Sequence, residues 1–218
     1  MYFKKGSFRR SVCLLLVCVI LFSLVPIGVF AVDMEDVSPD DWFYHYVRDG
    51  RDLGLIVGTS EEEFRFEPHR NMTRAEFVTL LGRLHELRIN AIDVPADDTF
   101  YGRYLAWAVD LGIVHGNEHG DLMPYAPLTR EQMAVIVDRY IHIFRISMPW
   151  QISPPILDPS DSADISDWAS SAVYRLSGYS LLYDTTVSGW TFRPQAHVPR
   201  TEAVAILMRL NIEMRSPL

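Results

Sequence analysis

The sequence is poor in cysteine. Both cysteines, Cys13 and Cys18, lie near the start of the 218 residues, and none follows them. The rest of the chain therefore has no disulfide, no thiolate metal site and no cysteine nucleophile. Val12 and Val17 precede the two cysteines and are β-branched, which argues against a lipid-modified cysteine. The fold must be held by packing, and a chain of this length buries about 70% of its unfolded surface.

Positive charge is in the minority once the first residues are set aside. The chain has 20 Lys and Arg residues against 28 Asp and Glu residues. Four of the basic residues and none of the acidic ones lie in residues 1–31, so the remaining 187 residues hold 16 against 28. No basic surface is left for a nucleic acid, which excludes that class of partner. An anionic ligand must be bound by local contacts rather than by long-range attraction.

A long apolar run occurs only at the start, over Val12–Ala31. It follows the basic segment Met1–Arg10 and ends in Val29-Phe30-Ala31, a sequence typical of signal cleavage. We expect residues 1–31 to be a signal peptide, and the protein to be secreted with no membrane span after cleavage. The alternative is an uncleaved anchor, because the run is about long enough to cross a bilayer.

Signatures of catalysis are missing as well. The sequence has no nucleophile elbow, phosphate loop or metal-ligand cluster. His115 and His119 are four residues apart, but Gly116 lies between them in an expected turn, so they do not form a helical metal pair. We expect no catalytic residue, no metal and no cofactor. Paired carboxylates for glycoside cleavage stay open as an alternative, since acidic residues are abundant.

What the sequence does have is one unit in three copies. Each copy has a proline six residues before an arginine, a second arginine nine residues after it, and an aromatic residue 30 or 32 residues before it. With the arginine segment itself and an apolar residue two positions before each proline, these make five coincidences in register, three times over, which indicate internal duplication. The aligned segments are Thr73-Arg74-Ala75-Glu76, Thr129-Arg130-Glu131-Gln132 and Pro199-Arg200-Thr201-Glu202, with the aromatic residues Trp42, Phe100 and Trp168.

Each copy reads as helix, loop, helix. Apolar residues after the aromatic and after the arginine recur with helical spacing, so each helix has one buried stripe. Thr73 with Glu76, and Thr129 with Gln132, form capping boxes, whereas Pro199 removes that cap from the third copy. One helical pair cannot bury its own stripe. We therefore expect an all-α fold in which three helix-loop-helix repeats pack as one pseudo-threefold bundle.

These residues resemble the S-layer homology family. The likeness rests on Asp36-Val37, Trp42, Gly54-Leu55-Ile56-Val57-Gly58, Phe66-Glu67-Pro68 and the Thr-Arg-Ala-Glu segment, and on their counterparts in copies two and three. It covers nearly all of the chain after residue 31. It implies S-layer homology repeats at residues 32–84, 93–140 and 157–213.

The resemblance implies non-covalent binding of a cell-wall polysaccharide, as in binders of pyruvylated secondary wall polymer, at the cell surface. The ligand is then a wall polysaccharide or a peptidoglycan-linked polymer held in grooves between repeats, with surface-layer proteins as further partners. The motif arginine of each copy would contact the ketal carboxylate. The implied ligand-binding residues are Arg74, Arg130, Arg200, Trp42, Phe100, Trp168, Asp36, Asp93, Asp161, Gly58 and Gly116.

The chemistry of the arginine position agrees with that role. A helix N-terminus has unpaired N–H groups and a partial positive charge, and a guanidinium fork matches a carboxylate. We expect the three arginines to face outward, and copy three to be the weakest site, because Ser180, Asp184 and Pro199 depart from the pattern. Each arginine could instead be a structural ion-pair partner, and the tryptophans simple core residues. For the whole protein, the alternatives are a surface-layer assembly protein and a secreted polysaccharide-modifying enzyme.

Overall fold

The computed structural model describes residues 34–58, 64–149, 161–182 and 191–214. The chain divides into two units, Met1–Asp33 and Met34–Leu218, and all described residues belong to the second. The expected signal peptide, the start of the third repeat and Asp184 lie outside the described residues.

The described part is all-α, as the sequence predicts. Three shorter helices alternate with three that begin at the motif arginines. No strand is named in the described segments, which contain only isolated bridges between loops. The helices are α2 (Tyr44–Asp52), α3 (Arg74–Arg88), α4 (Gly102–Asp110), α5 (Arg130–Ile143), α6 (Asp167–Gly178) and α7 (Arg200–Glu213), with a short 3₁₀ helix, η1 (Ser162–Asp164).

The starts of the later helices are fixed by their caps. Thr73 accepts a hydrogen bond from the Glu76 amide and Thr129 one from the Gln132 amide, and both capping boxes are closed by the return bond. Pro199 makes no side-chain cap. The three predictions about these helix starts are therefore confirmed.

The first helices end in a left-handed residue. Gly54 and Gly112 have φ angles of 71° and 73°, and Ser180 holds the same position with a φ of 58°. In each case the following amide reaches back to the carbonyl at the helix end, as Leu55 does to Gly50, which is the Schellman pattern. The third copy keeps this turn although serine adopts the conformation at a steric cost.

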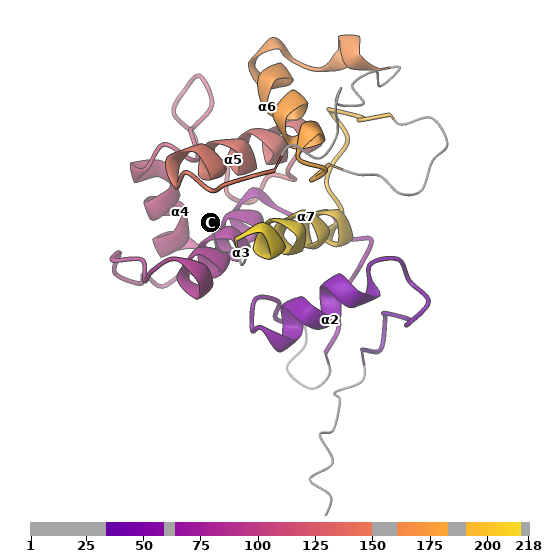
Figure 1. The fold of residues 1–218 in the computed structure, drawn as a ribbon. Helices are drawn as coiled ribbons and strands as arrows, with labels where there is room; N and C mark the ends of the chain where they lie inside the picture. The colour runs from indigo at the N-terminus through magenta and orange to yellow at the C-terminus, as the bar shows by residue number, and fades with distance from the viewer. Residues whose placement is uncertain (1–33, 59–63, 150–160, 183–190, 215–218) are drawn as a thin grey trace, which may run out of the picture. The chain divides into compact units, whose positions relative to one another are not determined.

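The closest helix pairs join different copies. The later helix of each copy packs against the first helix of the next copy: α3 against α4, α5 against α6, and α7 against α2. α3 also packs against α7, and these two lie side by side in Figure 1. The duplicated unit in sequence is thus not the packing unit, because each apolar stripe is covered by a neighbouring copy.

The loops before the later helices are linked in a closed cycle. The Met72 amide donates to the Val198 carbonyl, the Val198 amide to Leu128, and the Leu128 amide to Met72. All three side chains are fully buried. The cycle ties the starts of α3, α5 and α7 together. A common axis for the whole helical pairs stays a prediction.

The helix α3 extends beyond residue 84, where the sequence predicts the first repeat to end, and continues to Arg88. His85 is 2% exposed and packs against Trp107, Tyr140 and Phe144. Burial among these rings lowers the pKa of His85. An apolar environment therefore extends the helix past its predicted end.

Candidate ligand-binding grooves

Two grooves of the described part are lined by equivalent residues of the three copies. The motif arginine of one copy forms one side, and the turn and later helix of the next copy form the floor. The exposed aromatic residue of the remaining copy closes the groove. One groove contains Arg74 and Trp168, and the other contains Arg130 and Trp42. The prediction of grooves between repeats thus has a structural counterpart at both places.

The Arg74 groove is the larger of the two, about 640 Å³ against about 150 Å³. Gln132 and Arg139 of α5 line it together with Arg74 and Trp168. The Arg74 Nη2 donates to the His115 carbonyl at 2.6 Å, and its Nε is buried without a hydrogen-bond partner among the described residues. No ion pair joins Arg74 to a carboxylate in the described part of the chain, although Glu118 and Asp121 also line the groove.

Burial changes the electrostatics of this guanidinium. Removal from water lowers the pKa of Arg74, and the positive charge of Arg139 lowers it further. Both effects mean that the charged form is under-compensated in its surroundings. An incoming anion would supply the missing negative charge.

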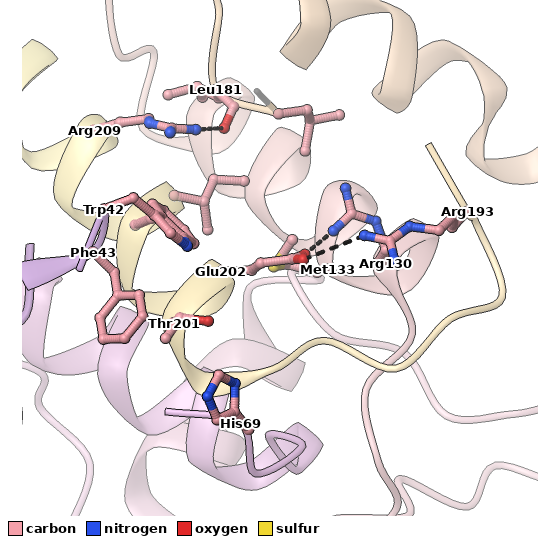
Figure 2. A pocket seen from close by; sticks show the side chains of 13 residues that line it. Trp42, Phe43, His69, Arg130, Met133, Leu181, Arg193, Thr201, Glu202 and Arg209 are labelled. Carbon is pink, nitrogen blue, oxygen red and sulfur yellow. Dashed lines mark hydrogen bonds and ion pairs between the residues drawn. The ribbon is translucent and has the colours of Figure 1, made fainter. Parts of the chain in front are cut away.

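The Arg130 groove already contains its counter-ion. Arg130 is 4% exposed, forms an ion pair with Glu202 and donates from Nε to the Phe192 carbonyl. Figure 2 shows the Glu202 carboxylate directed at both Arg130 and Arg193, below Trp42. The guanidinium is thus neutralised by the protein itself.

Arg200 is held in the same way. It is 7% exposed, donates from Nε to the Phe66 carbonyl at 2.7 Å and lies 3.9 Å from the Glu76 carboxylate. Glu76 also pairs with Arg70 at 2.6 Å. Burial would raise the pKa of Glu76, but the hydrogen bonds from Arg70 and Thr73 outweigh it and keep that pKa below its usual value.

The expectation of three outward-facing arginines is therefore wrong for two of them. Arg130 and Arg200 are buried structural ion-pair partners, and Arg74 alone of the three lines a groove without a carboxylate partner among the described residues. The physical reason is the third residue of the later helix in the next copy. It is a glutamate paired with the arginine in two cases, and in the third it is Gln132, which lines the groove of Arg74 without a charge.

The helix N-termini are not free either. The Arg74 and Ala75 amides donate to the carbonyls of Ala126 and Pro124, and the Glu76 amide to Thr73. The first amides of α5 and α7 are satisfied in the same manner by neighbouring loops and caps. The amides of the predicted anion site are thus already hydrogen-bonded within the protein, so an anionic ligand would have to be bound by side chains.

The aromatic residues lie at the surface. Trp42 is 38% exposed, Phe100 55% and Trp168 57%. The alternative that the two tryptophans are simple core residues is excluded. Trp168 and Trp42 each line a groove, so each has an apolar face available to a sugar ring.

Two of the three predicted aspartates support loops. The Asp36 carboxylate accepts from the Phe66 and Glu67 amides, and Asp161 accepts from the equivalent amides of Phe192 and Arg193. Glu67 and Arg193 have positive φ angles, so the carboxylates hold a strained turn before each proline. Asp93 is exposed and makes no such bond among the described contacts.

The two predicted glycines are required by close backbone contacts. A side chain at Gly116 would collide with the Gly120 backbone, at 2.5 Å, and one at Gly58 would crowd Phe64 and Arg65. Gly116 lines the Arg74 groove. It shapes the groove wall without a side chain of its own.

Sequence reasoning missed the counter-ions. The sequence predicts a capping role for Glu76 and Gln132 and none for Glu202; the cross-copy packing pairs Glu76 and Glu202 with arginines and places Gln132 in the groove of Arg74. The signal that could have found them is the change of charge at this position between copies. Arg139, the second arginine of copy two, donates to the Ile113 carbonyl and also lines the groove.

Two further properties of the described residues bear on function. None of their helices is both long enough and apolar enough to cross a bilayer. They contain no cluster of three or more His, Cys, Asp or Glu residues with metal-binding geometry. The described part is an all-helical module with surface grooves, and in one of them Arg74 has no ion-pair partner among the described residues.

Such a module is a binding domain, and comparison with known proteins gives its family. Residues 33–78 and 93–134 match the S-layer homology domain family. These two segments are therefore S-layer homology repeats. S-layer homology domains hold proteins at the cell surface or cell wall, which is therefore where this chain is placed.

Three relatives illustrate where such repeats occur. The chain is 28% identical to an endoglucanase of Bacillus sp. (strain KSM-635) over 95% of its own length and 22% of the relative. It is 30% identical to the surface-layer 125 kDa protein of Lysinibacillus sphaericus over 50% of the chain and 10% of the relative. It is 26% identical to the cellulosome-anchoring protein of Acetivibrio thermocellus, over 66% and 33%. The chain thus spans a third or less of the length of each.

Proposed function

We propose that this chain attaches to the cell wall by binding an acidic wall polysaccharide in the Arg74 groove, and that it has no catalytic activity of its own. The observation that carries the proposal is the partly buried guanidinium of Arg74, whose Nε has no hydrogen-bond partner among the described residues, in one groove with the exposed Trp168. The family supports attachment to the wall, and the partial matches to enzymes are matches to a small part of each enzyme.

The groove supplies the two contacts that an acidic sugar needs. The guanidinium of Arg74, with that of Arg139 in the same groove, matches a carboxylate in charge and in hydrogen-bond geometry. Trp168 offers a flat apolar surface to the sugar ring. A pyruvate ketal places a carboxylate directly on a hexose ring, so a pyruvylated secondary wall polymer is the ligand that we propose.

The proposal is tested by co-sedimentation of the purified protein with wall sacculi. Binding should be strong to intact sacculi and lost when mild acid has stripped the secondary polymer. Binding that survives stripping would assign the partner to peptidoglycan and contradict the proposal. No binding to intact sacculi would contradict it as well and favour contacts with other surface-layer proteins.

A second measurement tests the absence of catalysis. Sacculi incubated with the protein should release no more soluble sugar than sacculi alone. Release that is lost on replacing one carboxylate would contradict the non-catalytic part of the proposal and support a polysaccharide-modifying enzyme.

A further inference from the structure

We propose that the third residue of each later helix decides whether the motif arginine of the preceding copy can accept an external anion, and that Gln132 keeps the Arg74 groove open. The inference rests on the proposed function, because it assigns the specificity of the same groove to one residue. It also predicts the valency of the described part, which is one open groove.

The pairing of arginines with residues of the next copy supports this assignment. Arg130 of copy two pairs with Glu202 of copy three, and Arg200 of copy three lies 3.9 Å from Glu76 of copy one. The remaining arginine is Arg74 of copy one. In copy two, the residue equivalent to Glu202 and Glu76 is Gln132. Gln132 and Arg74 line the same groove. Glutamine is similar in size to glutamate but has no charge, so it leaves the guanidinium without an internal counter-ion.

The hydrogen bonds of the three arginines differ with the residue at this position. With a glutamate opposite, the Nε of Arg130 and of Arg200 donates to a loop carbonyl, at 2.5 and 2.7 Å. With Gln132 opposite, the Nε of Arg74 has no partner among the described residues, and the Nη2 donates instead to the His115 carbonyl. Arg74 therefore lies along the groove wall, where an anion could reach it.

A carboxylate at position 132 would compete with any anionic ligand. It would pair with Arg74 inside the groove and repel an incoming carboxylate. The capping box would survive, since Glu76 closes the equivalent box in copy one. Gln132→Glu thus changes the charge that faces Arg74 and leaves the local helix start intact.

The test compares Gln132→Glu with Asn90→Asp in the full chain. Asn90 is exposed and lies beyond the C-terminal end of α3, at the opposite end from Arg74, so its change adds the same charge outside the groove. The probe is a methyl hexoside carrying a pyruvate ketal, titrated by calorimetry. We expect affinity to fall about 10- to 100-fold for Gln132→Glu and to stay near wild type for Asn90→Asp. Equal affinity of Gln132→Glu and wild type would overturn the inference.

Thermal melting without any ligand separates failure of this inference from failure of the proposed function. We expect Gln132→Glu to melt above wild type, because the new carboxylate compensates Arg74. A gain together with no binding of the probe by wild type would uphold the internal pairing and overturn the proposed ligand. Absence of a gain would overturn the pairing, whatever the binding result.

The reciprocal change opens a second groove. Glu202→Gln removes the counter-ion of Arg130, beside Trp42. The titration should then show two sites per chain in place of one. A soluble, folded Glu202→Gln variant that still has one site would contradict the rule for that groove.

Discussion

The Arg74 groove and the Arg130 groove are made of equivalent residues from three copies, yet they have different electrostatics. The first contains Arg74, Arg139 and Gln132, with Glu118 and Asp121 in its lining but no carboxylate paired with Arg74 among the described residues. In the second, Arg130 is paired with Glu202. The difference shows that a motif residue can bind a ligand in one copy and stabilise the fold in another. Equivalence in sequence does not establish equivalence in function.

The largest expected effect is on the stability of the protein, and it concerns the Arg130 groove. Arg130→Ala leaves the carboxylate of Glu202 without its buried partner, which costs about 3–5 kcal/mol in the free energy of unfolding. Arg74→Ala should cost about 1 kcal/mol or less, because Arg74 donates one hydrogen bond and pairs with no carboxylate among the described residues. Urea denaturation measures both values. Equal losses would contradict the comparison.

The next largest effect is on binding to the wall, and it concerns the Arg74 groove. Arg74→Ala should weaken binding to intact sacculi by about 10- to 100-fold, because the charged hydrogen bonds to the ligand are worth about 1.5–3 kcal/mol. Arg145→Ala removes the same charge from an exposed turn and serves as the control. Quantitative co-sedimentation gives the affinities. If both variants bind alike, the groove is not the ligand site.

The two tryptophans extend the comparison with a smaller effect. Trp168→Ala should reduce affinity about 3- to 10-fold, since aromatic contacts contribute about 0.5–1.5 kcal/mol. Trp42→Ala, in the Arg130 groove, should leave the affinity for the wall unchanged. Both residues are exposed, so neither change should lower the melting temperature much. An equal loss of affinity for the two variants would indicate that both grooves bind.

The smallest expected effect concerns the turn that differs in copy three. Ser180 holds a left-handed conformation that Gly54 and Gly112 adopt without steric cost. Ser180→Gly should therefore raise the free energy of unfolding by about 0.5–1 kcal/mol. Chemical denaturation measures the change, with Ser170→Gly, in the interior of α6, expected to destabilise. A loss of stability for Ser180→Gly would show that serine is not strained there.

Local structure was largely predictable from the sequence. The capping residues Thr73 and Thr129 mark the starts of α3 and α5, and Gly54 and Gly112 mark the ends of α2 and α4. These features depend on residues within one turn of one another, so a sequence window contains the whole cause. The apolar stripes likewise became the core.

The grooves could not be predicted in the same way. The stripes show which face of a helix is buried but not which helix covers it, and here the partner belongs to another copy. The charge state of the grooves depends on that pairing. Arg200 meets Glu76 across more than a hundred residues, and no local pattern contains that contact. The same distance explains why the resemblance suggested three outward-facing arginines.

The central claim is that a wall-derived carboxylate binds at Arg74. The most direct test is a crystal structure of the protein with an acidic disaccharide released from its own wall polymer. We predict that the carboxylate lies on the Arg74 guanidinium and the sugar ring on Trp168, with the Arg130–Glu202 pair intact. A sugar bound against Arg130 or Arg200, with the Arg74 groove empty, would contradict the account.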